Sequence, residues 1–244
     1  MTEKIKVVSV LPDLLGTYGD SGDAIVASRR LALRGYEPRL VTAVLGEAVP
    51  ADGDFYLIGG GEDGPQAKAA QLLNTDAALE AALDRGAALL AVCAGFQILG
   101  ESFIGPDMNP TTGIGVFACK THRFDGPRSV GELVTAPTPG IDGVPELTGY
   151  ENHQGVTELL EGTIPLGMVL VGKGNNCGKR IDGAVSGKAI GTYMHGPVLA
   201  RNPALCDYFL SLVVGKLEPL EDVRLERAHA KLYEERIKEA YKLR

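Results

Sequence analysis

The sequence lacks any run of about 18 apolar residues, the length that a membrane-spanning helix needs. It also lacks an excess of positive charge, because 24 Lys and Arg residues stand against 31 Asp and Glu residues and give a net charge of −7. This balance disfavours a broad interface with nucleic acid or with anionic lipid. The charged residues 1–6 lead straight into a strand-like segment and do not form a signal peptide. We therefore predict a cytoplasmic protein with no nucleic-acid partner and no direct membrane insertion.

Several motifs of common enzyme classes are missing. The 4 cysteines and 4 histidines form no C-x-x-C pair and no other zinc-binding spacing. Gly172–Arg180 resembles a phosphate-binding loop, but Lys173 stands where its first glycine is needed and Arg180 where serine or threonine is needed. Neither G-x-S-x-G nor a G-x-G-x-x-G after the first strand is present. We therefore expect no metal and no cofactor, and neither a serine hydrolase nor a dinucleotide enzyme.

The first half of the chain alternates short β-branched runs with helical patterns, and 45% of the 244 residues are hydrophobic, enough for one substantial core. The predicted strands are Ile5–Val10, Glu37–Thr42, Phe55–Ile58 and Ala88–Val92, and the predicted helices are Gly22–Arg34 and Thr75–Arg85. This order predicts an α/β fold: a flavodoxin-like, mostly parallel central sheet with helices on both faces. Such sheets bind ligands beyond the carboxyl ends of their strands.

After about residue 113 the predicted strands become shorter, and we expect them to extend the same sheet. They are Val130–Thr135, Met168–Val171 and Ala189–Tyr193. A helix is predicted at Pro203–Val214. The charged stretch Leu220–Leu243 carries apolar residues at roughly helical intervals. It is either a solvated helix packed by one face or a docking helix for a partner.

The strongest local signal is Leu89–Gln97, an apolar strand that stops at Cys93 and turns through Gly95 into a helix. A sharp strand-to-helix turn exposes a nucleophile at the edge of the sheet, and the start of the following helix favours a thiolate. The competing interpretation is a buried, inert cysteine, since free cysteines are among the most buried residues. The strand and turn favour Cys93 as a nucleophile.

The glycine-rich loop Gly59–Asp63 follows the third predicted strand and lies on the same edge as Cys93. Glycines let backbone N–H groups point into the crevice, so Gly60 together with Ala94 is the expected oxyanion hole. By itself this motif is weak, because many strand-to-helix loops are rich in glycine.

A thiol nucleophile needs a general base, and His195 is the best candidate. It ends the apolar run Ala189–His195, which delivers it to the sheet edge. His153 is the competing candidate, although a structural role suits it better, and His122 and His229 look exposed.

These residues, in this order, resemble the class I (triad) glutamine amidotransferases, in the branch found in cobyric acid and cobyrinic acid diamide synthases. The similarity is closer still to the GatD-type glutaminase subunits of lipid II isoglutaminyl synthase. The segments that carry it are Leu14–Asp20, Gly59–Asp63, Tyr150–Gly155 and Gly174–Asn176.

The resemblance implies that Cys93 attacks the side-chain amide of glutamine, that His195 moves the proton and that a thioester is then hydrolysed. It also implies that Arg128 and Gln97 contact the substrate; a guanidinium suits the α-carboxylate of glutamine. The alternatives are a surface position for Arg128 and a solvent-facing position for Gln97.

The resemblance further implies a protein partner, the Mur-ligase-like subunit MurT, which uses ATP to amidate the D-glutamate of lipid II to D-isoglutamine. Residues 1–215 then form the amidotransferase domain, and residues 216–244 form a helical extension packed on it or on the partner. Two other functions remain open: an amidotransferase subunit for another acceptor such as cobyrinate, and a non-catalytic flavodoxin-like binding module.

One position departs from the family pattern. Most triad amidotransferases carry a glutamate two residues after the histidine, where this chain has Pro197. We expect the carboxylate that orients His195 to come from the partner, with Glu151 as a local alternative.

Overall fold

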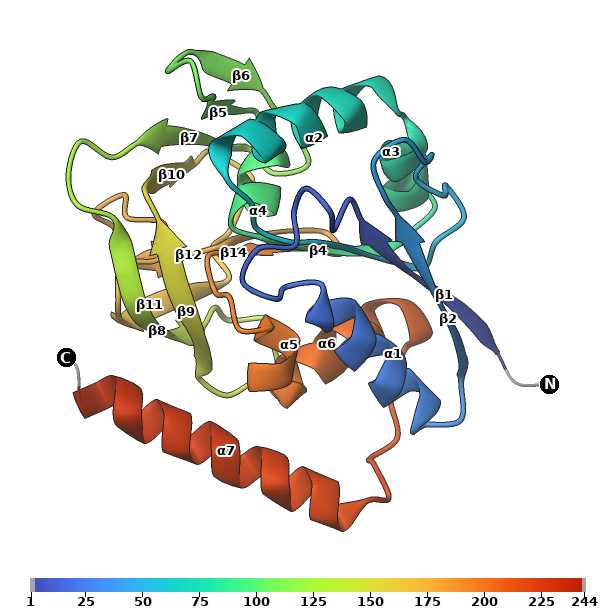
Figure 1. Ribbon diagram of the computed structural model, residues 1–244. Helices are drawn as coiled ribbons and strands as arrows, with labels where there is room; N and C mark the ends of the chain where they lie inside the picture. Colours follow the sequence, from blue (N-terminus) through green and yellow to red (C-terminus); the bar gives the residue numbers. More distant parts are fainter. Residues whose placement is uncertain (1–2, 243–244) are drawn as a thin grey trace.

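The structure, a computed structural model, describes residues 3–242 and is built around a six-stranded sheet (Figure 1). In spatial order its strands are β13 (Ala184–Ser186), β14 (Ala189–Thr192), β4 (Ala88–Val92), β3 (Phe55–Ile58), β1 (Lys4–Val10) and β2 (Glu37–Ala43). The strands from β14 to β2 pair in parallel, and β13 adds an antiparallel edge.

Helices cover both faces of this sheet (Figure 1). One face carries α1 (Gly22–Ala32), α5 (Val198–Arg201) and α6 (Pro203–Val214), and the other carries α2 (Asp63–Thr75), α3 (Ala78–Asp84) and α4 (Ala94–Ile98). Every residue of β3 and β4 is buried, as expected for strands covered on both faces. The predicted α/β fold with a mostly parallel central sheet is confirmed.

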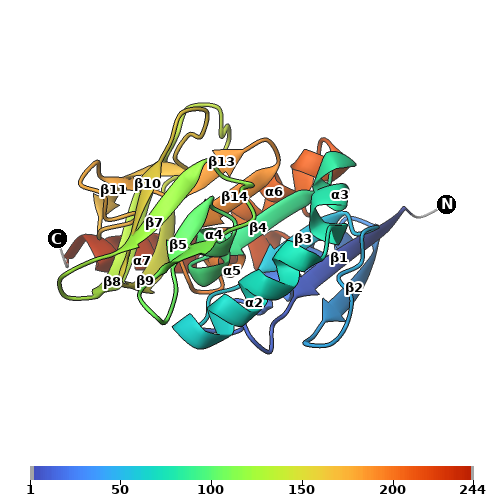
Figure 2. The ribbon, with the colours of Figure 1, turned by 90° about the horizontal axis from the view of Figure 1, so that it is seen from above.

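Two smaller sheets stand beside the central one. The first contains β10 (Gly155–Leu159), β7 (Cys119–Arg123), β5 (Ser102–Ile104) and β6 (Pro110–Thr112). The second, which we call the side sheet, contains β12 (Ile181–Asp182), β11 (Gly167–Val171), β8 (Ser129–Pro137) and β9 (Leu147–His153). Seen from above, the side sheet lies at the opposite end of the molecule from β2 (Figure 2).

The prediction that all later strands extend the central sheet is wrong for Val130–Thr135 and Met168–Val171. These segments lie in β8 and β11 of the side sheet and pair with each other in antiparallel fashion. Joining the parallel sheet requires a crossover connection, usually a helix, which these segments lack. Of the three later strands that were predicted, only the one observed at Ala189–Thr192 joins the central sheet.

The helix predicted over Thr75–Arg85 is present as α3, with a later start, and the helix α2 that precedes it was not predicted. The helix α2 ends at Thr75, and α3 begins at Ala78. Between them, the Asp76 carboxylate accepts hydrogen bonds from the N–H groups of Ala78 and Val49. Asp76, which has an extended backbone, thus holds the turn between the two helices. The start of α2 lies at Asp63-Gly64-Pro65, where glycine and proline conceal the helical pattern.

The C-terminal helix α7 (Val223–Lys242) lies along the outside of β8 and β9 (Figure 1). Ala240 is fully buried against Val134 and Val171, and the Tyr233 hydroxyl donates a hydrogen bond of 2.7 Å to the Glu146 carbonyl. The predicted terminal stretch extended to Leu243, which lies outside the described residues. Among residues 3–242 no helix is both long enough and apolar enough to cross a membrane.

Candidate active site

Cys93 occupies a strained turn between β4 and α4. Its backbone has φ 51° and ψ −105°, and its N–H donates to the Thr192 carbonyl at 2.9 Å. A non-glycine residue in such a region costs about 1–3 kcal/mol, and such strain clusters at functional sites. The neighbouring Gly95 cannot be larger, because a Cβ there would lie 2.8 Å from the Ile58 carbonyl oxygen. The turn has the geometry of the predicted nucleophile elbow.

His195 lies beside Cys93 and is oriented by an acid of its own chain. The Nδ1 atom of His195 is 2.8 Å from Oδ2 of Asp20, and both side chains are buried. The other ring nitrogen, Nε2, is buried without a nitrogen or oxygen partner among the described residues, and the Cys93 sulfur is the reactive group next to it. Cys93, His195 and Asp20 therefore have the arrangement that a nucleophile, a base and an orienting acid require.

The expectation of a carboxylate from the partner is therefore wrong, because Asp20 occupies that position. Glu151, the local alternative, is wrong as well. Its carboxylate accepts hydrogen bonds from the N–H groups of Lys173 and Gly174, at 2.9 and 2.8 Å. The nearest imidazole to it is that of His153, at 3.8 Å. Glu151 thus anchors the loop after β11 and leaves His195 to Asp20.

The pKa of His195 reflects two opposing effects. Burial lowers it, but the hydrogen bond with Asp20 and the adjacent Cys93 outweigh burial and raise the pKa of His195 to about 10. The contact with Asp20 thus favours the protonated form of the ring.

The glycine loop supports the acid. The Gly60 N–H donates to Oδ2 of Asp20 at 2.9 Å, and a Cβ on Gly60 would lie 2.6 Å from Cε1 of His195. This N–H is occupied by the acid, and Gly60 is not among the residues that line the cavity next to Cys93. Gly61 and Ala94 do line that cavity. Gly61 therefore replaces the predicted Gly60 as the candidate oxyanion donor of this loop.

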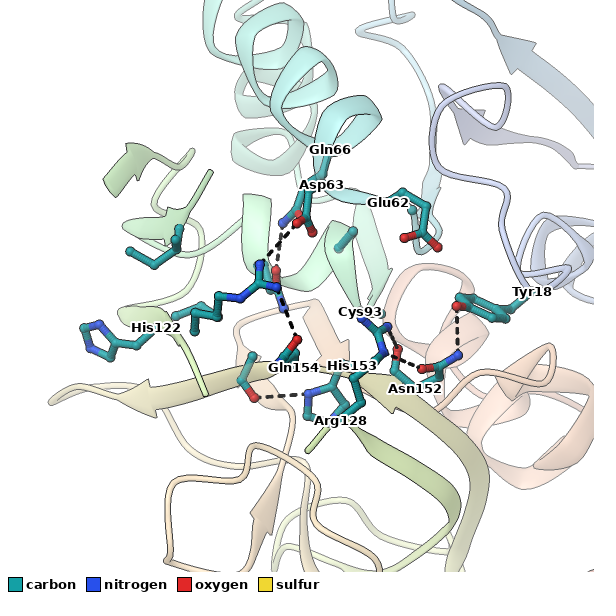
Figure 3. Close-up of a pocket in the computed structure, with 17 residues that line it drawn as sticks. Tyr18, Glu62, Asp63, Gln66, Cys93, His122, Arg128, Asn152, His153 and Gln154 are labelled. Carbon is teal, nitrogen blue, oxygen red and sulfur yellow. Dashed lines mark hydrogen bonds and ion pairs between the residues drawn. The ribbon is translucent and has the colours of Figure 1, made fainter. Parts of the chain in front are cut away.

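A polar cavity opens directly over Cys93 (Figure 3). Its wall includes Tyr18, Glu62, Asp63, Gln66, Gln97, Thr121, His122, Arg123, Arg128, Asn152, His153, Gln154 and Gly155. The wall is contributed by both small sheets and by the loops at the carboxyl edge of the central sheet. This is the position at which open α/β sheets bind ligands.

Arg128 is held at the cavity by Asn152. Its Nε donates to Oδ1 of Asn152 at 3.0 Å, and its Nη2 donates to the Asn152 carbonyl at 3.2 Å. The Asn152 amide in turn donates to the Tyr18 hydroxyl at 2.9 Å (Figure 3). The Tyr18 ring covers His195, with ring centroids 4.6 Å apart. Arg128, which was predicted to contact the substrate, thus faces the cavity. Asn152 links it to Tyr18, whose ring covers His195.

Gln97 also lines the cavity, but its amide is part of a network. Its Nε2 donates to the Tyr193 hydroxyl at 3.0 Å, and its Oε1 accepts from Gln66 at 2.8 Å. Tyr193 is fully buried and stacks on His153, with ring centroids 3.8 Å apart. His153 is therefore a residue of the cavity wall held against Tyr193, whereas His195 is the histidine that pairs with Asp20. Gln97 faces the cavity and the network, and not bulk water.

Tyr18, Gln66 and Asn152 are cavity residues that the sequence interpretation did not assign. Tyr18 and Asn152 lie within two segments that carry the family resemblance, and this position could have identified them as candidates from the sequence. Gln66 had no such signal, because the start of α2 was not predicted. His122 is exposed at the cavity, as predicted.

Comparisons with known proteins identify relatives of the whole chain. Residues 6–203 match the CobB/CobQ-like glutamine amidotransferase domain. Over 213 residues the chain is 32% identical to the GatD subunit of lipid II isoglutaminyl synthase (glutamine-hydrolyzing) from Staphylococcus aureus, covering 85% of this chain and 83% of that protein. The corresponding subunit from Streptococcus pneumoniae is 28% identical over 246 residues, with 98% and 90% covered. Cobyric acid synthase from Streptococcus sanguinis is 32% identical over 148 residues, but only 57% of this chain and 28% of that protein are covered.

Solved structures share the fold. A glutamine amidotransferase crystal structure superposes with a TM-score of 0.57 at 22% identity, covering 85% of this chain and 98% of that one. A glutamine amidotransferase from Thermotoga maritima gives a TM-score of 0.52 at 15% identity, with 98% and 93% covered. The sequence match and the fold agree with the class I resemblance, and the chain belongs to the CobB/CobQ-like glutamine amidotransferase family and is a glutamine amidotransferase.

Proposed function

We propose that this chain is the glutamine-hydrolysing subunit of a lipid II isoglutaminyl synthase, and that Cys93 forms a thioester with glutamine. The observation that carries the chemistry is the buried Asp20–His195 pair, 2.8 Å apart, beside a cysteine at the floor of a polar cavity. The observation that favours this acceptor is coverage: the two GatD relatives match over 83% and 90% of their own length.

In the first half of the reaction the Cys93 thiolate attacks the side-chain carbonyl carbon of glutamine. The N–H groups of Gly61 and Ala94, which line the cavity, stabilise the resulting oxyanion. The protonated His195 donates its proton to the amide nitrogen, and the C–N bond breaks to release ammonia. A glutamyl thioester remains on Cys93.

In the second half a water molecule attacks the thioester carbonyl carbon. Neutral His195 takes a proton from this water, the C–S bond breaks, and glutamate leaves with the thiolate–imidazolium pair restored. Asp20 keeps the imidazole in one tautomer throughout, because it binds Nδ1 and leaves Nε2 for the reacting atoms.

Arg128 binds the α-carboxylate of glutamine through its guanidinium. Two of its nitrogens are positioned by Asn152, which limits the orientations of the group at the cavity. Gln97 contacts the substrate from the opposite wall, where its own amide is fixed by Gln66 and Tyr193.

The ammonia serves a separate Mur-ligase-like subunit, MurT, in a cytoplasmic complex in which ATP is consumed by the partner. That partner amidates the D-glutamate of lipid II to D-isoglutamine. Residues 1–215 form the amidotransferase domain and residues 216–244 the helical extension, whose helix α7 packs by one face on the side sheet. Cobyrinate is the less favoured acceptor, because the cobyric acid synthase relative is matched over only 28% of its length.

The test is to incubate the chain with glutamine, alone and with the MurT-type subunit of the same organism, ATP and lipid II. Glutamate release and amidated lipid II are measured together. Glutamate release coupled to lipid II amidation supports the proposal. Glutamate release without lipid II amidation, but with amidation of cobyrinate by its synthetase, would transfer the chain to the other acceptor.

A further inference from the structure

The short helix α5 begins immediately after the catalytic turn and takes its cap from elsewhere in the chain. Pro197 occupies the N-cap position of α5 and makes no side-chain cap. In its place, Oδ1 of Asp23, at the start of α1, accepts a hydrogen bond of 2.7 Å from the N–H of Leu199. Asp23 is 1% exposed, and Leu199 is fully buried. A carboxyl group from another helix thus satisfies an amide that would otherwise be buried without a partner.

The start of α1 holds the turn after β14 at three points. Asp20 binds the His195 ring, and Asp23 binds the Leu199 amide. Between these two, Gly22 packs on Pro197 so closely that a Cβ on Gly22 would lie 2.5 Å from Cγ of the proline. These three contacts fix the backbone that carries the His195 imidazole. The contact made by Asp23 is the one farthest along the chain from His195, at Leu199.

We propose that Asp23 is a positioning residue for glutamine hydrolysis, which fixes the turn after His195 and with it the imidazole at Cys93. This inference rests on the proposed function. Asp23 itself does not line the cavity and touches no reacting atom.

The surroundings of Asp23 favour its neutral form. The titratable groups that face it are Asp20 in the loop before α1, His195 on the connection to α5, and Cys206 on α6. Burial raises the pKa of Asp23 to about 8, and the negative charge of Asp20 acts in the same direction, whereas the hydrogen bond from the Leu199 N–H opposes them. The second oxygen, Oδ2, is buried without a hydrogen-bond partner in the described chain, which further disfavours a charge.

This arrangement predicts different results for two substitutions of the same residue. Asp23→Asn is neutral and keeps an oxygen that accepts the Leu199 N–H, so turnover at pH 7 should stay within about threefold of wild type. Asp23→Ala removes the acceptor and frees the turn, so kcat should fall about 10- to 100-fold while KM changes less than about twofold. The matched control is Asp76→Ala, which removes another carboxylate bound to backbone N–H groups, far from the site. It should lower Tm without changing kcat.

A second readout does not depend on glutamine. Iodoacetamide alkylates the thiolate, so the pH dependence of Cys93 alkylation reports the position of His195. A Cys177→Ser background removes the one cysteine that is not classed as buried. Asp23→Ala should shift this pH profile, whereas Asp23→Asn and Asp76→Ala should retain it.

The proposal is overturned if folded Asp23→Ala keeps wild-type kcat and alkylation, or if Asp23→Asn loses as much activity as Asp23→Ala. Should Asp23→Ala fail to fold, Asp23→Ser, whose shorter side chain cannot span the distance to the Leu199 N–H, takes its place in both measurements. Wild-type kcat and alkylation in folded Asp23→Ser overturn the proposal. If the wild type releases no glutamate from glutamine while its alkylation profile responds to Asp23 as described, the proposed function fails and the positioning role stands.

Discussion

Asp20 and His195 are 175 residues apart in the sequence, yet their side chains meet in a buried hydrogen bond of 2.8 Å. The same Asp20 oxygen accepts the Gly60 N–H, so the acid is fixed by the glycine loop as well as by the histidine. An acid held from two sides has little freedom to leave the ring. An acid of this chain therefore contacts His195 despite Pro197.

Asp20→Asn should lower kcat for glutamine hydrolysis about 10²- to 10⁴-fold, with little change in KM. The asparagine amide can donate to Nδ1 and favour the wrong tautomer of His195, as known for the corresponding acid of serine proteases. Steady-state glutamate release measures the effect. Asp13→Asn is the matched control, because Asp13 also accepts a backbone N–H, that of Leu45, but outside the cavity. Equal activity of the two variants would show that Asp20 does not act on the histidine.

Cys93→Ala should abolish glutamine-dependent amidation by the partnered enzyme, whereas amidation with a high concentration of free ammonia should persist. Only the thiolate forms the thioester, and ammonia bypasses that step. Amidated product is measured with each nitrogen source. Cys206→Ala is a useful control, since Cys206 is buried in α6 away from the cavity and burial raises its pKa. Glutaminase activity retained in Cys93→Ala would rule out the nucleophile.

Arg128→Ala should weaken glutamine use about 10- to 100-fold in kcat/KM, through the loss of a charge-assisted contact of about 1.5–3 kcal/mol. Arg128→Lys should restore only part of this loss, because an ammonium cannot reproduce the planar fork or both bonds to Asn152. Glutamine kinetics at several concentrations test both variants. Unchanged kinetics in both would place Arg128 outside the substrate site.

Stability should fall as the pH rises from 5.5 to 8.5, and Asp182 should contribute to the fall. Burial raises the pKa of Asp182 to about 7, so the folded protein holds this proton more tightly than the unfolded chain. The stabilisation is complete below the unfolded pKa of about 4 and is lost as the pH rises through about 7. We expect Tm to decrease by about 5 °C over this range, and by less in Asp182→Asn. Identical pH dependence of Tm in the two proteins would contradict this assignment.

Much of the fold was predictable because its signals are local. The strands Phe55–Ile58 and Ala88–Val92 and the helix Pro203–Val214 have the predicted bounds, since continuous apolar runs and a proline at a helix start mark them directly. The assignment of β8 and β11 to one sheet or another was not local. A strand's own residues do not state which neighbour it pairs with, and these two pair with each other.

The same distinction applies to the site. Cys93 and His195 each end an apolar strand, and that position indicates chemistry without any knowledge of their neighbours. Asp20 follows no strand and lies in a loop, and only the approach of α1 to the turn after β14 brings it to the histidine. The protonation state of Asp23 likewise depends on burial and on the adjacent acid, which a sequence pattern does not record.

Two main-chain hydrogen bonds connect His195 to Tyr150 of β9, at 3.0 and 2.8 Å. The same strand carries Asn152, which holds Arg128. His195 and Arg128 are thus both hydrogen-bonded to β9, so a movement of the side sheet shifts both residues together. Alanine scanning would overlook this mechanical link, because no side chain makes it. Replacing Tyr150 by proline, which deletes one of the two donors, would reveal it.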